Sequence, residues 1–173
     1  MVVSIGIPLD ENSSYLQGVA KAPQKIRDAY HSDSSNYCTE NGLDLSKAND
    51  WSDLGDLVLS PLPQAFSEIE KSIAGHLVDG KKVLSLGGDH SITYPIIKAF
   101  GKKYAGLNIL HIDAHGDLYD EFDGNKFSHA CPFARIMEEG LAKRLVQVGI
   151  RTLNPHQAEQ AKRFGTEPAT GCQ

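Results

Sequence analysis

The fold is decided by Leu107–Asp117, whose sequence is LNILHIDAHGD. Leu107–Ile112 is apolar enough for a buried strand, and side chains able to bind metal follow at Asp113, His115 and Asp117. Because side chains alternate in direction along an extended chain, positions i, i+2 and i+4 point the same way. The sequence therefore predicts three ligands for a divalent cation at one edge of a sheet.

A second motif, Gly-Gly-Asp-His-Ser over residues 87–91, also follows an apolar run directly. His90 in this motif is expected to be a further ligand, and Asp89 beside it is expected to orient an imidazole from outside the coordination shell. His111 lies inside the strand of the first motif and shares the face of Asp113. We expect His111 to be buried and hydrogen-bonded in a structural role.

Apolar runs and helical patterns alternate along the chain. Strands are expected at Val2–Ile7, Val83–Leu86, Leu107–Ile112 and Leu145–Ile150, and more weakly at Leu54–Leu59. Helices are expected to begin near Pro63, Ser91, Pro132 and Asn154 and to end near Gly80, Gly101, Gly140 and Gly165. This order indicates an α/β fold, a three-layer α/β/α arrangement with a mostly parallel sheet. Ligands of such folds bind beyond the carboxyl ends of the strands, where both motifs lie.

The segment Ala114–Cys131 lacks periodicity and is rich in polar side chains. A long polar loop after a central strand is typical of substrate contacts, although a solvated surface excursion is the alternative. His129 in this loop is either a proton shuttle for a leaving amine or an exposed side chain. Cys131 is expected to pack in the interior, because no base is evident beside it.

Composition narrows the class of protein. The 173 residues suffice for one domain, and a net charge of −5 argues against a nucleic-acid surface. No apolar run is long enough to span a membrane, and the start lacks the pattern of a signal or transit peptide. Three widely spaced cysteines fit neither a disulfide framework nor a zinc knuckle. An intracellular location is the plain expectation.

Carboxylates and imidazoles without thiolates suit Mn²⁺, and Zn²⁺ is the alternative. Two such ions roughly 3.5–4 Å apart can share a water molecule and lower its pKa toward neutrality. Asp113 or Asp117 would serve as the carboxylate that holds both ions.

These motifs are similar to those of the ureohydrolases, the family of arginase and agmatinase, and especially to the plant-type members. The matching stretches are Gly6–Gly18, Gly87–Pro95, His111–Ile136 and Leu145–Gly165. The resemblance implies that residues 1–165 are the N-terminal part of a single ureohydrolase domain. Residues 166–173 are then a divergent tail.

The resemblance implies a binuclear manganese site that hydrolyses a guanidinium carbon and releases urea. Carried over by position, His90, Asp113 and Asp117 would ligate the first ion, and Asp113 and His115 would ligate the second. The implied substrate is a small guanidino compound, arginine or agmatine. The complete proteins of the family form trimers or hexamers, which leaves the oligomeric state of this chain open.

The resemblance also assigns roles in the polar loop. His129 matches the proton-relay histidine of the family, and the stretch with Asn125 and Ser128 matches the loop that contacts the far end of the substrate. Gly116 stands at a position that varies in the family.

One departure from the family is large. The family carries a later Ser-x-Asp-x-Asp motif and a substrate-binding glutamate, and neither occurs in these 173 residues. The implied fold is therefore an incomplete arginase-like fold that lacks its C-terminal strands. The expectation is a truncated ureohydrolase whose activity is weak or lost.

Two other functions stay open. The chain is either a related hydrolase of another guanidino or formimino compound, or a non-catalytic fragment that binds metal weakly or associates with a full-length partner. The expected compartment is the cytoplasm or an organellar matrix.

Overall fold

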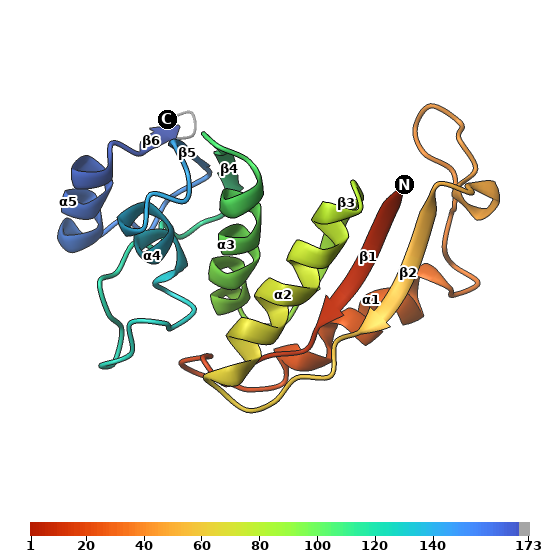
Figure 1. The fold of residues 1–173 in the computed structure, drawn as a ribbon, viewed down its shortest axis with the longest axis horizontal. Helices are drawn as coiled ribbons and strands as arrows, with labels where there is room; N and C mark the ends of the chain where they lie inside the picture. Colours follow the sequence, from red (N-terminus) through yellow and green to blue (C-terminus); the bar gives the residue numbers. More distant parts are fainter. Residues whose placement is uncertain (170–173) are drawn as a thin grey trace. The chain divides into compact units, whose positions relative to one another are not determined.

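The computed structural model describes residues 1–169 (Figure 1). The chain divides into two compact units. The first comprises Met1–Glu11 and Leu16–Asp89, and the second comprises Asn12–Tyr15 and the chain from His90 onward. One domain over residues 1–165 with a tail over 166–173 stays a prediction, and positions 170–173 of that tail lie outside the described residues.

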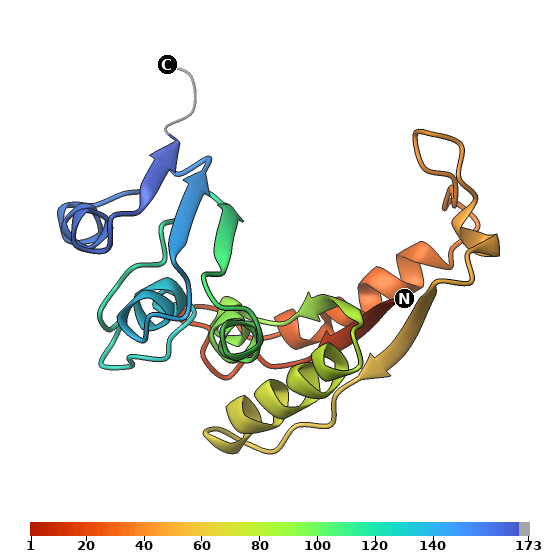
Figure 2. The same cartoon turned by 45° about the horizontal axis from the view of Figure 1, so that its top comes forward.

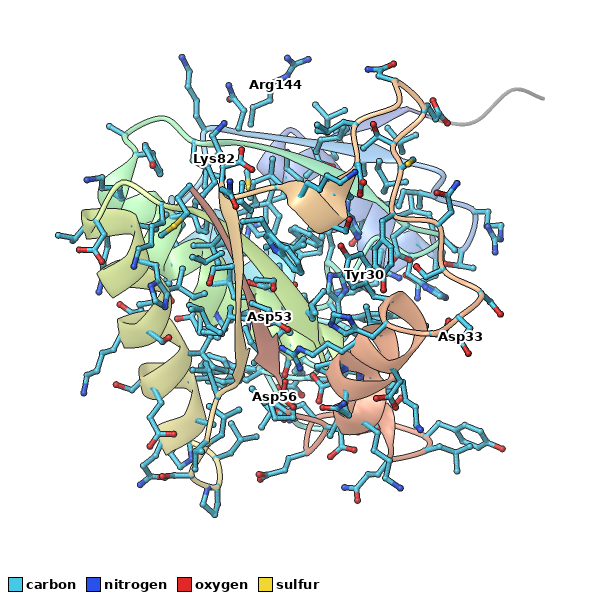
Figure 3. The ribbon with its side chains drawn as sticks, turned by 90° about the vertical axis from the view of Figure 1, so that its right-hand side faces the viewer. Tyr30, Asp33, Asp53, Asp56, Lys82 and Arg144 are labelled. Carbon is cyan, nitrogen blue, oxygen red and sulfur yellow. The ribbon has the colours of Figure 1, made fainter. Side chains whose placement is uncertain are left out.

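The first unit is a parallel three-stranded sheet with a helix on each side. The order in the sheet is β2-β1-β3. The strands are β1 (Val2–Ile7), β2 (Trp51–Asp56) and β3 (Lys82–Gly87). The helices are α1 (Ala22–Tyr30) and α2 (Gln64–Val78), and short 3₁₀ turns occur at Val19–Lys21 and Leu45–Lys47. Figure 3 shows α1 and α2 on opposite sides of the sheet.

Apolar residues at strand and helix spacing form the core of this unit. Strand β1 is buried from Val3 to Ile7 on both faces, as the central strand of a sheet with a helix on each side requires. Helix α2 buries Ile69, Ile73 and Leu77, which recur every fourth residue and so line one face. Part of the apolar pattern is thus buried within the unit, whereas Leu84 of β3 and Ile26 of α1 are 51% and 47% exposed.

A guanidinium group joins α1 to β2. Arg27 donates to Asp53 at 2.6 Å and also pairs with Asp56, and Figure 3 labels both carboxylates on β2. Gly6 faces this cluster, because a Cβ atom there would lie 1.8 Å from Oδ1 of Asp56. The glycine is needed so that β1 can pass beneath the ion pairs.

The second unit contains another parallel three-stranded sheet, in the order β4-β5-β6 (Figure 2). The strands are β4 (Asn108–Ile112), β5 (Arg144–Val148) and β6 (Glu167–Ala169). A 3₁₀ turn at His90–Ile92 leads into α3 (Thr93–Lys103), and the other helices are α4 (Pro132–Glu138) and α5 (Pro155–Phe164). Helix α4 packs against both α3 and α5.

The two faces of β4 differ. His111 is buried on one face, whereas Leu110 and Ile112 on the other are 64% and 73% exposed. Within the described residues β4 pairs with β5 alone, so it is an edge strand of its sheet. An apolar face beside an unpaired edge is a surface that a further segment of polypeptide can cover.

The predicted α/β class with parallel strands is confirmed. Strand β1 has the predicted bounds, and α5 begins after the Asn154 cap and ends at Gly165, which adopts the left-handed conformation. The strand predicted weakly at Leu54–Leu59 is present, but its predicted bounds are wrong, because β2 begins three residues earlier, at Trp51, and ends at Asp56. Among residues 1–169, no helix combines the length and the apolar character that crossing a bilayer requires.

Candidate metal centre

The predicted metal-ligand residues after β4 lie in a loop and not in the strand itself. Strand β4 ends at Ile112, and the backbone N–H of Asp113 still donates to Val148 of β5 at 3.0 Å. Asp117 has a φ of 49°, in the left-handed region that aspartate tolerates better than most residues. Asp113 and Asp117 therefore meet through a turning loop, and the expected strand alternation across them is wrong.

Four side chains from two separate motifs converge in the second unit. His90, His111, Asp113 and Asp117 each offer a ligand atom, and these atoms all lie within 4.8 Å of one another. Nδ1 of His90 lies 2.7 Å from Oδ2 of Asp117. The carboxyl end of β4 and the turn before α3 thus supply one compact group of nitrogen and oxygen donors, which fits a first-row divalent cation.

An aromatic side chain of α4 holds the two imidazoles of this group. The ring centroid of Phe133 lies 4.2 Å from that of His111 and 5.7 Å from that of His90. Pro132 opens the helix at its first turn, where the missing N–H costs nothing, and so fixes the place of Phe133. Packing against a fully buried ring limits the orientations that both imidazoles can adopt.

His115 lies at the margin of the group. Its backbone N–H donates to Oδ1 of Asp113 at 2.8 Å and its Nδ1 lies 3.2 Å from the same oxygen, but the side chain is 63% exposed. Burial opposes ionisation of Asp113. The hydrogen bonds from the backbone and side chain of His115 help to outweigh this, and the pKa of Asp113 lies below its usual value. The carboxylate is thus ionised at neutral pH, as a metal ligand must be.

His111 is buried and hydrogen-bonded, which confirms the expected surroundings of this residue. Its Nδ1 lies 3.0 Å from Nε2 of Gln147, the residue opposite it on β5. Burial, and then the neighbouring His90, lower the pKa of His111 below the usual histidine value. The imidazole is therefore neutral at neutral pH.

A cavity of about 410 Å³ opens over the group. Its lining includes the four predicted ligands, His90, Asp113, His115 and Asp117, together with the loop residue His129. This volume is in the range of small-molecule sites. The predicted ligands and the predicted proton relay therefore share one pocket.

The hydrogen bonds of His129 assign different roles to its two ring nitrogens. Nδ1 lies 2.9 Å from the carbonyl oxygen of Asn12, which only accepts, so Nδ1 carries the hydrogen of the neutral ring. Nε2 is then the acceptor, and the Ser14 hydroxyl lies 3.3 Å from it. Asn12 and Ser14 were missed as candidates, although the polar run Asn-Ser-Ser near the N-terminus was the available signal.

Asn125 and Ser128 make hydrogen bonds within this part of the unit. Asn125 donates to Oδ1 of Asn12 at 2.8 Å, and the Ser128 hydroxyl lies 3.1 Å from Nδ1 of His129. Neither Asn125 nor Ser128 is among the described residues that line the 410 Å³ cavity. Their predicted contact with substrate stays a prediction.

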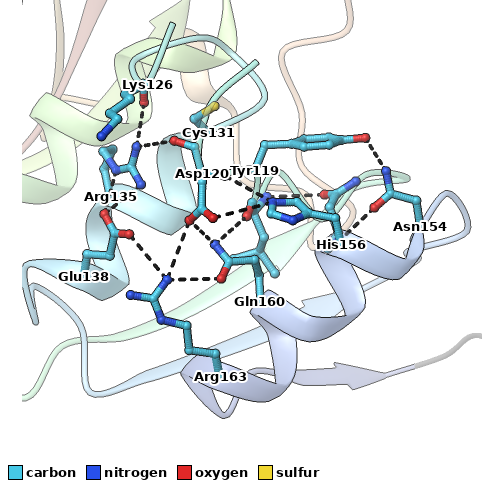
Figure 4. A network of polar contacts seen from close by, with 12 residues as sticks. Tyr119, Asp120, Lys126, Cys131, Arg135, Glu138, Asn154, His156, Gln160 and Arg163 are labelled. Atoms are coloured by element: carbon cyan, nitrogen blue, oxygen red, sulfur yellow. Dashed lines mark hydrogen bonds and ion pairs between the residues drawn. The ribbon is translucent and has the colours of Figure 1, made fainter. Parts of the chain in front are cut away.

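The loop between β4 and α4 is anchored at its base (Figure 4). The buried guanidinium of Arg135 donates to the carbonyl oxygens of Asp120 at 2.6 Å and Lys126 at 3.1 Å. Gln160 of α5 donates to the side chain of Asp120 and to the carbonyl oxygen of Leu118. Three backbone carbonyl oxygens of the loop thus receive hydrogen bonds from side chains of α4 and α5.

Cys131 precedes α4 and is fully buried. Burial raises the pKa of its thiol to about 11. The thiolate required of a nucleophile is therefore scarce at neutral pH, in agreement with a packing role.

Comparison with known proteins finds one family. A family model described as the arginase family matches residues 1–170. The chain is 46% identical to "Arginase 1, mitochondrial" of Arabidopsis thaliana over 94% of its own length and 50% of that protein. It is 35% identical to the N(1)-aminopropylagmatine ureohydrolase of Thermus thermophilus over 95% of its length and 55% of that protein.

The structure of the arginase from Medicago truncatula has the same fold. It superimposes with a TM-score of 0.91 at 41% identity, over 98% of this chain and 56% of that one. The predicted three-layer class is thereby confirmed. The chain spans about half the length of the curated relatives it matches.

Proposed function

Because this chain belongs to the arginase family, we propose that it carries part of a centre that hydrolyses a C–N bond of arginine or agmatine with release of urea. The observation that carries the proposal is the shared cavity of His90, Asp113, Asp117 and His129. The names of two relatives support it, since one is an arginase and the other a ureohydrolase of an agmatine derivative.

The donor set fits manganese. His90, Asp113 and Asp117 would hold the first ion, and Asp113 with His115 would contribute to the second. When bound, the ions supply Lewis-acid polarisation of the substrate and a nucleophile at neutral pH. The depressed pKa of Asp113 keeps its carboxylate ready to bind, and the left-handed backbone of Asp117 suits a site where local strain serves binding.

The polar loop would handle the proton and the substrate. His129 would accept a proton at Nε2 and pass it to the leaving amine, since Asn12 holds the other ring hydrogen on Nδ1. Asn125 and Ser128 would contact the far end of a small guanidino substrate. To do so, each would give up a present hydrogen bond, Asn125 with Asn12 and Ser128 with His129. Their bonds to Asn12 and His129 link substrate binding to the orientation of the relay.

The 173-residue polypeptide by itself is expected to be a weak catalyst. It offers four predicted ligand side chains, of which His115 is mostly exposed and, among residues 1–169, contacts Asp113. The family resemblance implies further aspartate ligands from a Ser-x-Asp-x-Asp motif, which does not occur in these 173 residues. We therefore propose metal binding with little or no urea release for this polypeptide.

A second candidate function is association without catalysis. The exposed Leu110 and Ile112 beside the unpaired edge of β4 favour a chain that joins a full-length partner of the same family. The compartment we propose is the cytoplasm or an organellar matrix. The mitochondrial designation of the Arabidopsis relative supports the latter.

The test combines metal uptake with product release. The purified chain is incubated with Mn²⁺, desalted and analysed for bound metal, and urea is measured with arginine, agmatine and a formimino substrate in turn. We expect bound manganese that Asp113→Ala removes and that the exposed Asp33→Ala control retains, with urea release far below that of the Arabidopsis arginase assayed in parallel. A chain that takes up no manganese would contradict the metal centre. Urea release at the rate of that arginase would contradict the reduced activity.

A further inference from the structure

Gln147 defines the hydrogen position on His111. Both side chains are buried, and the two residues are paired across β4 and β5. The same nitrogen of Gln147, Nε2, lies 2.7 Å from the carbonyl oxygen of Gly116 and 3.0 Å from Nδ1 of His111. A carbonyl oxygen only accepts, so the group facing it must be the NH₂ end of the glutamine. Its second hydrogen is then directed at Nδ1, which must accept.

Because Nδ1 accepts from Gln147 it carries no hydrogen, so the ring hydrogen of His111 is on Nε2. Nε2 is buried and has no hydrogen-bond partner among the described residues. It lies 3.7 Å from Oδ2 of Asp113, the carboxylate oxygen that His115 leaves free. An N–H therefore faces the oxygen donors of the cluster from inside the protein.

We propose that His111 is a positioning residue, which Gln147 holds as an Nε2–H donor toward the Asp113 carboxylate, and that it is not a metal ligand. This inference rests on the proposed metal centre. Ring nitrogens bind metals through a free lone pair, which this tautomer lacks on the side facing the cluster. His111 lies close to His90, Asp113 and Asp117. Its hydrogen bond with Gln147 nevertheless gives it a different role from these three residues.

Each oxygen of Asp113 therefore has a different nitrogen neighbour. Oδ1 receives the backbone N–H of His115, and Oδ2 faces the N–H of His111. Ligation by His111 would require its hydrogen to move to Nδ1, where it would meet the NH₂ of Gln147 as donor against donor. That NH₂ end cannot be reversed without placing an amide oxygen against the carbonyl oxygen of Gly116.

The first test reads the tautomer directly. Long-range ¹H–¹⁵N correlation spectra of histidine-labelled protein, at one fixed pH, distinguish a protonated from an unprotonated ring nitrogen. The His111→Phe variant assigns the signal. We expect a protonated Nε2 in the metal-free chain and in the chain loaded with diamagnetic Zn²⁺. A protonated Nδ1, or loss of the Nε2 hydrogen on loading, would overturn the inference.

The second test separates a donor from a ligand. Mn²⁺ affinity is measured by electron paramagnetic resonance for variants whose circular dichroism matches the parent chain. We expect about 10–100-fold weaker binding for His111→Phe, as for loss of other partners outside the coordination shell. His111→Gln keeps an N–H donor without a ring nitrogen and should recover most of that loss, while His31→Phe at an exposed position should change nothing.

The outcomes divide clearly. Unchanged affinity in His111→Phe, or equal losses in His111→Phe and His111→Gln, would overturn the positioning role. A parent chain that binds neither Mn²⁺ nor Zn²⁺ would contradict the proposed metal centre instead. The tautomer of the metal-free protein would then decide the present inference alone.

Discussion

Nδ1 of His90 lies 2.7 Å from Oδ2 of Asp117, although 27 residues separate them in the chain. The contact joins the turn before α3 to the loop after β4. It places an imidazole and a carboxylate where a single cation could bind both. Neither motif alone provides this arrangement.

His90→Ala should weaken Mn²⁺ binding by more than the roughly 10–100-fold that loss of an outer partner costs, because a donor atom itself is removed. Titration calorimetry on the folded variant measures the change. His31→Ala, at an exposed position, is the matched control. Equal affinities of His90→Ala and the parent chain would exclude His90 as a ligand.

Substitutions at Asp117 should separate backbone strain from metal binding. Asp117→Asn keeps a side chain that tolerates a φ of 49° and should unfold at nearly the parental denaturant concentration, but with weakened metal binding. Asp117→Val adds a β-branched side chain in the left-handed region and should cost a further ~1–3 kcal/mol of unfolding free energy. Urea unfolding without metal measures both, and equal stability of the two variants would contradict the strain.

The two described cysteines should differ in reactivity. At pH 8, iodoacetamide should modify the exposed Cys38 in the native chain and leave the buried Cys131 unmodified. With a pKa of about 11, only about one Cys131 thiol in a thousand is ionised at that pH. Peptide mass mapping of the Cys172→Ser variant, in which only Cys38 and Cys131 can react, measures the modification of each thiol. Modification of Cys131 before unfolding would mean that α4 opens readily.

Loss of Arg27 should destabilise the chain in a pH-dependent way. Arg27 lowers the pKa of Asp53, so this ion pair stabilises the fold above the unfolded pKa of about 3.9 and loses that effect as the pH falls through the lower folded value. Arg27→Met should therefore unfold at less denaturant at pH 7, and the difference from the parent should shrink below about pH 4. Lys25→Met, which removes only an exposed pair with Asp28, is the control. A difference that stays constant with pH would contradict the electrostatic origin.

The sequence predicted the strands and helices whose patterns are strong and local. β1 is a continuous apolar run, and α5 has both an Asn cap and a Gly stop. Helix α1 was not anticipated, although Pro23 in its first turn was an available start signal. Strand β6 has three residues, and its pairing with β5 is a tertiary contact that no local pattern encodes.

The composition of the candidate site followed from motif spacing, but its geometry did not. Strand alternation predicted that Asp113, His115 and Asp117 would point together, whereas the loop turns after Ile112 and leaves His115 mostly exposed. The convergence of His90 with Asp117 depends on the tertiary fold. The hydrogen bond between His111 and Gln147 depends on the register of β4 against β5, which the sequence does not state.

The register of β4 (Asn108–Ile112) limits the insertions and deletions that the gene can tolerate. Shifting a strand by one residue exchanges its two faces. A single inserted or deleted codon here would turn His111 toward solvent, move Leu110 against Phe133 and unpair Gln147. Surface loops such as the one between α1 and β2 should tolerate the same change of length far better. Selection should therefore remove insertions and deletions in these five codons more strongly than in the loops.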